Sequence, residues 1–555
     1  MSLNLDPPAD PDGYWESLGV TNSPKLGVAD KRPKPSKTPT DKAVTIKVIA
    51  GQLDKVATKG EQALVDSGMP IYQRGQSIVR PILTEVPASR GRTTLAAGLS
   101  QIGAAALTDR LCQAAEWERF DKRSADWVRI DPPSAVSVTI LSRNGLWKFP
   151  RVAGVITTPT LRPDGSLLTA DGYDAATRLF HAADAKLDVM AHIPEELRKD
   201  DAVAALKKLQ RLLKNFPFVT PTDEAVAISA VITPVIRGAV SVAPMHAFRA
   251  STAGTGKTYL ADVASAIATG RPCPVATVAK TEEETEKRLG GLLIAAHPII
   301  CLDNVNGELG GDLLCQAIER PIVQIRPLGT SEIIEIESRA TIFATGNAMR
   351  VRGDMTRRAI LSNLDAGLER PELREFDFDP VEQVLNNRAE YVAACLTIVL
   401  AHAKAGFPGA RDLRLASFQD WSNFVRSALV WLGCSDPCDS MEQAREDDPE
   451  LSELSELIEA WKAEFDVVMS FTTAELIDLV GQRLFSDEPG EPGQFKYPLM
   501  REIVLRVSES RQQGDSRKLA SYLRSKEGRI VGGFMVRKMG MASGGVVRWS
   551  VFKKP

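Results

Sequence analysis

The sequence has no long apolar run and no strong excess of charge. None of its apolar stretches reaches the roughly 18 residues that a membrane-spanning helix needs, and its first residues, MSLNLDPPAD, carry no apolar signal segment. Its seven cysteines are scattered, and Cys434 and Cys438 have no second pair nearby, so the sequence predicts neither a disulfide framework nor a zinc site. The net charge of −3 gives no general attraction to nucleic acid. We therefore expect a cytoplasmic protein with no membrane partner, whose basic surfaces are local.

The 555 residues predict several domains, at roughly 100–200 residues each. Residues 1–44, with many Pro, Asp, Lys and Thr, are expected to form a disordered tail or linker, with a basic arm on DNA as the alternative. Residues 45–215 combine strand patterns, SIVRPILTEV and AVSVTILSR, with an amphipathic helix, DDAVAALKKLQRLLKNF. Residues 216–380 alternate strands with helices, which predicts a parallel sheet. Residues 381–466 are mostly helical, and residues 467–555 are expected to form a small terminal domain.

The stretch STAGTGKT, residues 251–258, has the residues of a phosphate-binding loop. It follows a short apolar strand, MHAFRAS, and precedes a helical pattern, which is the order that such a loop needs. Backbone N–H groups at the helix N-terminus favour phosphate oxygens; Lys257 would reach the β- and γ-phosphates, and Thr258 would hold Mg²⁺. Ser251 replaces the usual first glycine. The predicted site for ATP and Mg²⁺ consists of Ser251, Thr252, Ala253, Gly254, Thr255, Gly256, Lys257 and Thr258.

Two later strands end in polar residues that would complete this site. IICLDN contains Asp303, which is predicted to hold the Mg²⁺ through water. Asn304 stands where such ATPases usually have a glutamate, and an amide can orient water but cannot take its proton. Glu308 or a neighbouring acid is therefore the alternative base. ATIFATGN ends in Asn347, which is predicted to position the attacking water.

An arginine pair, Arg357 and Arg358, follows ten residues later in GDMTRRAILSNLD. Surface arginine pairs are usually bound to acids. One placed after this strand can instead act on the γ-phosphate of a neighbouring subunit. This role requires a homo-oligomer.

In five stretches that keep their order, the chain resembles the AAA+ replicative helicases of phages, plasmids and integrated mobile elements. These helicases are similar to those of superfamily 3 and of minichromosome maintenance. The resemblance covers about residues 220–376 and implies an α/β fold: an AAA+ P-loop ATPase domain with a parallel sheet, an N-terminal α+β collar or DNA-binding domain and a C-terminal winged helix. It also implies a ring, usually a hexamer, that pulls one DNA strand through its pore, and a primase as a possible partner. The stretches are STAGTGKT, EEETEKRLGGLLIAAHPIICLDNV, QIRPLGTSEIIEI, TIFATGN and GDMTRRAILSNLDAGLERPELREF.

A hairpin before the TIFATGN strand is the first predicted DNA contact. PIVQIRPLGTSEIIEIESR alternates on both sides of a turn, and the resemblance implies that such a hairpin points into the pore. Its candidate contacts are Arg326, Gly329 and Thr330, and an ordinary surface hairpin is the alternative.

The second predicted DNA contact is the terminal domain. Residues 501–555 hold thirteen Lys or Arg and four acids. Thr472 and Glu475 predict a capping box that opens a helix; YPLMREIVLRV and SRKLASYLRSK predict two more helices, and a Gly-rich hairpin follows. This order predicts a winged helix that binds duplex DNA, with a protein-binding winged helix as the alternative. The candidate contacts are Arg517, Lys518, Arg524 and Arg537.

Two functions follow from these patterns. The first is an ATP-driven helicase that replicates a phage, plasmid or mobile element and contacts single- and double-stranded DNA. The second is an ATP-gated clamp or loader with little hydrolysis, because Asn304 replaces the usual acid. A packaging or transposition ATPase is disfavoured by the hairpin and by the terminal winged helix.

Overall fold

The computed structural model describes residues 44–554, except 89–90, 185, 280, 328–330, 411, 466, 468, 485–492, 509–512 and 543. The chain divides into two compact units. The first comprises residues up to 349 together with 357–441, and the second comprises 350–356 together with residues from 442 onward. The expected tail lies outside the described residues except for Val44. Within the described ranges, no helix combines the length and the apolar character needed to cross a bilayer.

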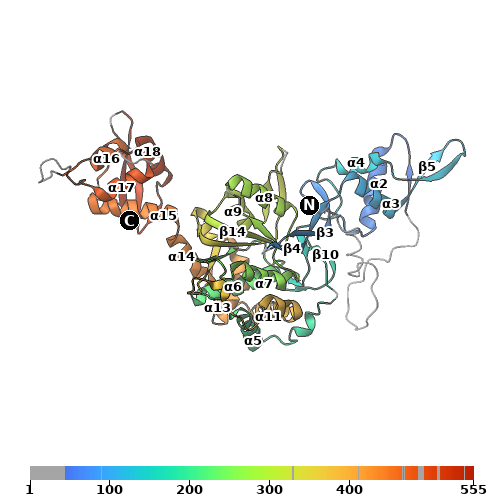
Figure 1. Ribbon diagram of the computed structural model, residues 1–555. Helices are drawn as coiled ribbons and strands as arrows, with labels where there is room; N and C mark the ends of the chain where they lie inside the picture. The colour runs from blue at the N-terminus through green and yellow to red at the C-terminus, as the bar shows by residue number, and fades with distance from the viewer. Residues whose placement is uncertain are drawn as a thin grey trace, which may run out of the picture. The chain divides into compact units, whose positions relative to one another are not determined.

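A five-stranded sheet forms the centre of the first unit (Figure 1). Its strands lie in the order β13-β14-β17-β12-β18, and the pairs β12–β17, β12–β18 and β13–β14 are parallel. The strands are apolar over most of their length because helices cover both faces of a parallel sheet. The predicted parallel sheet is thus confirmed. The strands are β12 (Met245–Ala250), β13 (Val275–Thr277), β14 (Ile299–Leu309), β17 (Thr341–Val351) and β18 (Ala359–Leu364).

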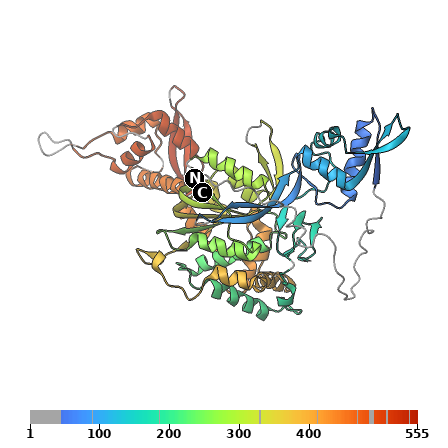
Figure 2. The same cartoon turned by 45° about the vertical axis from the view of Figure 1, so that its right-hand side comes forward.

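Helices lie on both sides of this sheet (Figures 1 and 2). Helices α6 and α7 lie on one side, and α8 and α9 on the other. Most residues of α6 are buried, from Ala225 to Thr233 without a break, in keeping with its continuous apolar sequence. These helices are α6 (Pro221–Val235), α7 (Lys257–Thr269), α8 (Glu282–Ile294) and α9 (Asp312–Glu319).

A further layer of helices packs on α6 and α7. Helix α5 packs on α11, which contacts α6 and α7 in turn. The predicted amphipathic helix is α5, whose leucines at 206, 209, 212 and 213 are buried. The helices are α5 (Lys199–Leu213), α10 (Pro380–Asn386), α11 (Arg388–Lys404), α12 (Gln419–Trp421) and α13 (Ser427–Trp431), with 3₁₀ turns at Met190–His192, Pro371–Leu373, Ala416–Phe418 and Pro437–Asp439 and a π-helical turn at Ser422–Arg426. Helix α14 (Ser440–Glu446) and the 3₁₀ turn at Gly353–Arg357 span the divisions between the two units along the chain.

The described residues of the range 44–181 form small sheets and the helices α2, α3 and α4. The sheets have the orders β1-β5-β6, β2-β3-β4, β10-β11-β7 and β8-β9. A core that includes Ile46, Leu111 and Trp117 joins β1 and β5 to α2, α3 and α4. The elements are β1 (Val44–Val48), α2 (Leu53–Asp66), β2 (Tyr72–Arg74), β3 (Ser77–Pro87), β4 (Thr93–Gln101), α3 (Ala104–Ala114), β5 (Ala115–Asp121), β6 (Asp126–Ile130), α4 (Ser134–Leu141), β7 (Gly154–Ile156), β8 (Thr160–Leu161), β9 (Leu167–Leu168), β10 (Gly172–Asp174) and β11 (Leu179–His181).

One sequence prediction in this region is wrong. AVSVTILSR was expected to be a strand, but most of it forms α4. Val136 and Ile140, four residues apart, are buried on one side of this helix against α2 and α3. A short apolar run does not separate helix from strand by its pattern alone, and here packing against two helices decides the outcome. The strand expected over SIVRPILTEV is present as β3.

The long ribbon of β3 and β4 joins this region to the central part of the first unit. The backbone N–H of Leu99 donates to the carbonyl of Ala295 at 2.8 Å. Gly98 allows this approach, because a Cβ there would lie 2.8 Å from the same carbonyl oxygen. The predicted hairpin before TIFATGN is also present and projects from the unit (Figure 2). Its antiparallel strands are β15 (Ile322–Ile325) and β16 (Ile334–Glu337).

Among its described residues, the second unit combines helices α15 to α18 with a three-stranded antiparallel sheet. The predicted capping box opens α16, where Thr472 accepts from the backbone of Glu475 and Glu475 accepts from that of Thr472. Trp461 and Trp549 lie in one apolar core. The elements are α15 (Pro449–Glu464), α16 (Thr473–Val480), α17 (Pro498–Val507), α18 (Ser516–Ser525), β19 (Ile530–Val531), β20 (Phe534–Met541) and β21 (Val547–Lys553).

The contact between β14 and β17 can be tested at a glycine. A Cβ on Gly346 would lie 2.2 Å from the Val305 carbonyl oxygen, so we expect Gly346→Ala to lower the free energy of unfolding by about 1–3 kcal/mol. The matched control is Gly291→Ala. Gly291 is exposed in α8 with open space around it, so this change is expected to raise the free energy by about 0.5–1 kcal/mol. Thermal denaturation followed by circular dichroism measures both, and an equal response of the two variants would contradict this packing.

Candidate nucleotide site

The loop between β12 and α7 holds two glycines in left-handed conformations. Gly254 has a φ of +77° and Gly256 a φ of +106°. A Cβ on Gly254 would also lie 3.1 Å from the backbone nitrogen of Glu372. Ser251 is exposed and its φ is not positive, so its position does not require glycine. The substitution of the first loop glycine by serine therefore leaves the loop conformation intact.

Lys257 begins α7 and its side chain turns back onto the loop. Its Nζ donates to the Thr252 carbonyl at 3.0 Å, and Thr255 Oγ1 donates to the same carbonyl at 2.7 Å. Burial lowers the pKa of Lys257, and the Asp303 carboxylate opposes this shift. The loop is open to solvent at Ala253, beside the N-terminus of α7. Because backbone N–H groups at a helix N-terminus favour negative charge, this end of α7 is suited to bind an anion.

Three side chains from three elements meet at the first turn of α7. Asp303 Oδ1 accepts from Thr258 Oγ1 at 2.8 Å and from Thr345 Oγ1 at 2.5 Å. The two hydroxyl oxygens lie 3.4 Å apart. Proteins usually bind Mg²⁺ through one or two carboxylates together with water and phosphate oxygens. The carboxylate and hydroxyl oxygens of this cluster fit that pattern, whereas the described residues hold no group of three or more His, Cys, Asp or Glu that could cage a metal.

The order of the strands brings Asn347 to the same edge. Strand β17 lies between β12 and β14, and Asn347 pairs with Ala250, the last residue before the loop. The Oδ1 of Asn347 is buried and has no hydrogen-bond partner among the described residues. Buried polar atoms are nearly always satisfied by protein, water or ligand. This oxygen is thus suited to accept a hydrogen bond from a water molecule in the site.

Thr345 is a site residue that the sequence prediction missed. Besides bonding Asp303, its Oγ1 accepts from the backbone N–H of Asn304 at 3.3 Å. A signal was available: Thr345 is a polar residue in an apolar strand and precedes Asn347 by two positions. Side chains two residues apart in a strand lie on the same face.

Both strands leave regular extended geometry at this edge. Asn304 has a φ of +58° and Ala348 a φ of +48°. Non-glycine residues in such conformations cost energy and are concentrated at functional sites, and asparagine tolerates them better than most residues. The Asn304 side chain is exposed. Glu308, the alternative base, is also exposed but lies four residues after Asn304 along β14, roughly 13 Å away if the strand were fully extended.

Arg357 and Arg358 both contact Glu319 of α9 but differ in exposure. Arg358 is 7% exposed, and its Nε donates to Glu319 Oε2 at 2.7 Å. Arg357 is 46% exposed, with its Nη1 3.4 Å from Glu319 Oε1. Burial would raise the pKa of Glu319, but hydrogen bonds from Ser417 and Arg358 outweigh it and lower the pKa. Arg358 is therefore held inside its own chain, and only Arg357 has the exposure that contact with another subunit requires.

The residues predicted to contact DNA lie in both units. In the hairpin, Arg326 is exposed directly after β15, while Gly329 and Thr330 lie outside the described residues. In the second unit, Arg517 and Lys518 lie in the first turn of α18, Arg524 in its last turn and Arg537 on β20, all exposed.

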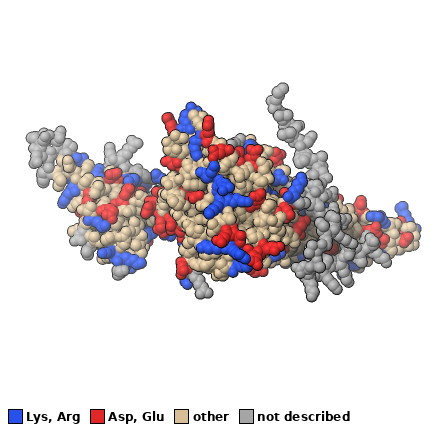
Figure 3. Space-filling view, turned by 90° about the horizontal axis from the view of Figure 1, so that it is seen from below, with Lys and Arg blue, Asp and Glu red and all other residues tan. Residues whose placement is uncertain are grey.

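Part of the basic charge counted in the terminal sequence is neutralised. Arg506 bonds Glu456 of α15, Lys538 bonds Glu527 at 2.7 Å, and Arg548 bonds Glu475 at 3.1 Å. On the face drawn in Figure 3, acidic side chains likewise lie among the Lys and Arg side chains. The candidates for binding a polyanion are therefore the Lys and Arg side chains of α18 and β20, rather than all the basic residues of the terminal sequence.

The chain resembles known proteins only distantly. No family model and no curated protein matches it. Among solved structures, the C-terminal region of NrS-1 matches over 89% of this chain and 99% of that one, at 12% identity and a TM-score of 0.36. SCCmec type IV Cch, described as an active helicase, matches over 86% and 94%, at 12% identity and a TM-score of 0.32. A JCV helicase matches over 48% and 77%, at 14% identity and a TM-score of 0.19. Scores this low do not establish a shared fold, so the function has to be inferred from the site.

The Thr258–Asp303–Thr345 cluster can be tested at Thr345. Thr345→Val keeps the shape but removes the hydroxyl that positions Asp303, so we expect ATP turnover to fall by about tenfold or more, roughly the effect of losing one or two hydrogen bonds in a site. Thr341→Val is the matched control, because Thr341 lies on the same strand and its buried hydroxyl has no partner among the described residues. Phosphate release at saturating Mg²⁺ measures turnover. Equal losses in both variants would show that strand packing, not the cluster, is responsible.

Proposed function

We propose that this chain is an ATP-driven AAA+ DNA helicase that serves the replication of a phage, plasmid or integrated mobile element. The observation that carries the proposal is the cluster of Thr258, Asp303 and Thr345 beside a glycine loop at a helix N-terminus. This arrangement offers amides and a lysine for phosphate and oxygen ligands for Mg²⁺. A sheet with the inserted strand β17 then supplies Asn347 beside the loop.

Each residue of the loop and cluster has a separate task in this proposal. The amides of the loop 251–256 and the N-terminus of α7 bind the phosphates, and Lys257 exchanges its bond to Thr252 for one to a phosphate oxygen. Thr258 and Asp303 hold the Mg²⁺, which when bound offsets the negative charge of the phosphates. The unsatisfied Oδ1 of Asn347 orients the attacking water. Thr345 keeps the Asp303 carboxylate in place.

Arg357 would complete the site of a neighbouring subunit. Its exposure, beside the buried and ion-paired Arg358, supports this assignment. Such an arginine stabilises the charge that develops on the phosphate during transfer. The role requires a homo-oligomer, and a hexameric ring is the state we propose.

The hairpin and the second unit are the proposed DNA-binding parts. The hairpin β15–β16, with Arg326 near its tip, would contact the strand that is pulled. In the second unit, helices α16, α17 and α18 precede the β20–β21 hairpin, and α18 with Arg517, Lys518 and Arg524 would enter duplex DNA as the recognition helix of a winged helix. Arg537 on β20 would contact the backbone from the wing. A primase partner and a cytoplasmic location stay predictions.

The alternative function is an ATP-gated DNA clamp or loader. The observation that favours it is Asn304, whose exposed amide cannot accept a proton. The left-handed conformation of this residue makes aspartate the acid that fits best, because longer side chains are less well tolerated there.

Asn304→Asp separates the two functions. If the native base lies elsewhere, we expect turnover to stay within about twofold of the wild type or to fall, because a new negative charge near the phosphates is unfavourable. A rise of about tenfold or more from a nearly silent enzyme would support the clamp or loader instead, since the missing base would have been restored. Steady-state phosphate release measures the change, with ATP binding monitored in parallel by a fluorescent analogue.

The helicase proposal is tested by ATP turnover with and without single-stranded DNA, beside Lys257→Ala. We expect DNA to stimulate the wild-type protein several-fold, and the variant to lose about a hundredfold or more because a charged phosphate ligand is removed. Strand displacement from a forked duplex should depend on the same lysine. ATP-dependent assembly on DNA without turnover would overturn the helicase proposal and support the clamp or loader.

A further inference from the structure

A cavity of about 530 Å³ lies beside the base of the β15–β16 hairpin, away from the loop residues described above. Its walls come from the β2–β3 turn, from residues 145–152, from Arg178 and from both strands of the hairpin. The charged residues among those that line it are Arg74, Arg151, Arg178, Glu335 and Glu337. We name it the arginine cavity.

Arg74 forms the inner wall, and its guanidinium donates its hydrogen bonds to backbone carbonyls. Its guanidinium donates to Leu293 O at 2.7 Å, to Ala153 O at 2.8 Å and to Glu337 O at 2.6 Å. These bonds tie the end of α8, the segment before β7 and the hairpin base together. These acceptors are neutral carbonyls. The hydrogen bonds therefore satisfy the N–H donors of Arg74 but do not neutralise its positive charge.

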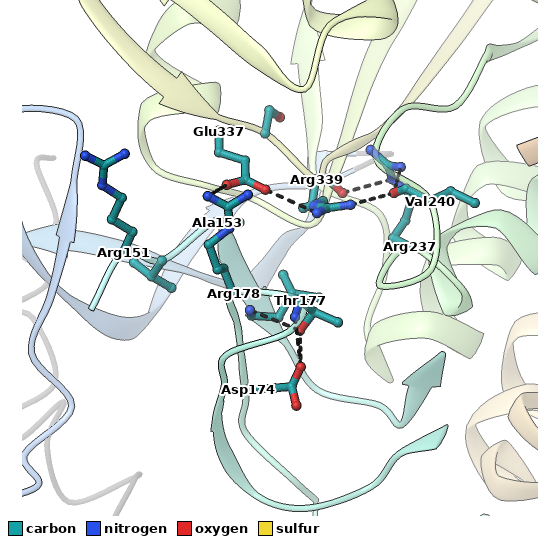
Figure 4. A network of polar contacts seen from close by, with 12 residues as sticks. Arg151, Ala153, Asp174, Thr177, Arg178, Arg237, Val240, Glu337 and Arg339 are labelled. Carbon is teal, nitrogen blue, oxygen red and sulfur yellow. Dashed lines mark hydrogen bonds and ion pairs between the residues drawn. The ribbon is translucent and has the colours of Figure 1, made fainter. Parts of the chain in front are cut away.

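Glu337 is shared between two arginines. Its Oε2 lies 3.2 Å from Arg178 Nη1, and its Oε1 lies 3.2 Å from Arg339 Nη2 (Figure 4). Behind Arg339, the buried Arg237 donates to the backbone carbonyls of Arg339, Val240 and Ala340. Burial and the nearby Arg339 lower the pKa of Arg237 to about 9. One carboxylate therefore cannot cancel the charge around it.

Arg151 is the residue of the arginine cavity that is available to a ligand. Its backbone is held by Tyr173, whose hydroxyl donates to the Arg151 carbonyl at 2.7 Å. Its side chain is exposed, and its guanidinium makes no hydrogen bond or ion pair with another described residue. Figure 4 shows it apart from the Glu337 network. Arg178 also lines the cavity, with 45% of its side chain exposed.

We propose that the arginine cavity binds a backbone phosphodiester of the single DNA strand that runs along the hairpin, with Arg151 as the main contact and Arg178 as the second. This proposal rests on the proposed function. Three arginines against two glutamates leave an excess of one positive charge on the lining residues, which matches the single negative charge of a phosphodiester. The glutamates oppose a doubly charged phosphate, and a cavity of this size does not admit a duplex. Gln76 on the same walls supplies a further neutral hydrogen-bonding group, whereas Gln73 Nε2 already donates to the carbonyl of Phe149 at 2.5 Å and Gln324 Nε2 to Glu335 Oε1 at 3.0 Å.

The test is binding of a fluorescein-labelled oligothymidylate to the full chain with a non-hydrolysable ATP analogue, followed by anisotropy over a range of salt concentrations. We expect Arg151→Ala to raise the Kd by about fivefold to tenfold at low salt and to reduce the slope of log K against log salt by about 0.7, the value of one single-strand phosphate contact. Arg151→Lys should keep the slope, since the charge is retained. Arg129→Ala is the matched control, because Arg129 is 77% exposed on β6, pairs with Glu116 and does not line the cavity.

The outcomes separate this proposal from the proposed function. If the wild type binds the oligonucleotide while Arg151→Ala shows an unchanged Kd and slope, the cavity proposal is wrong and the helicase proposal stands. If the wild type neither binds DNA nor shows DNA-stimulated turnover, both are wrong. Inorganic phosphate, added at constant ionic strength, should displace little of the Arg151-dependent binding. Displacement at millimolar phosphate would identify a free-phosphate site and overturn the assignment to a DNA strand. Equal melting temperatures of the variants verify that each is folded.

Discussion

The insertion of β17 between β12 and β14 is the constraint on which the candidate site depends. Without it, the loop strand β12 and strand β14, which carries Asp303, would be neighbours, and no β17 hydroxyl could bridge Asp303 and the Asn304 backbone. The close approach is possible because residue 346 has no side chain to meet the Val305 carbonyl. The same insertion places Asn347 opposite the last residue before the loop. This strand order thus brings together residues as far apart in the chain as Ala250 and Asn347.

Buried arginines play a comparable part at the base of the hairpin. The guanidinium groups of Arg74 and Arg237 donate hydrogen bonds to backbone carbonyls. They therefore hold distant segments together, while their own positive charge is not neutralised by these bonds. Burying a cation is costly unless its hydrogen bonds are satisfied, and here they are. The result is a cross-linked base for the hairpin, and Arg74 also carries its positive charge to the wall of the arginine cavity. The same arginine side chains thus hold the base of the hairpin together and supply its positive charge.

Charge in the second unit is organised differently from what a simple count suggests. Acids of α15 and neighbouring elements pair with Arg506, Lys538 and Arg548, so these cations serve the packing of the unit. Exposed pairs of this kind add little stability each, but they remove charge from the surface. What is left on α18 and β20 is a smaller and more defined basic area. Arg357 and Arg358 show the same division in the first unit, since Glu319 holds the buried arginine firmly and the exposed one at 3.4 Å.

The sequence by itself determined the local features of this protein. The glycines of the loop, the apolar strands, the amphipathic α5 and the capping box of α16 all follow from residues within a few positions of one another. Tertiary structure decided the rest: the helix over AVSVTILSR, the role of Thr345, the burial of Arg358 and the arginine cavity. Each of these depends on partners that strand order and helix packing bring close from remote parts of the chain. A local pattern records propensity and periodicity, but it does not record which remote side chain will stand beside it.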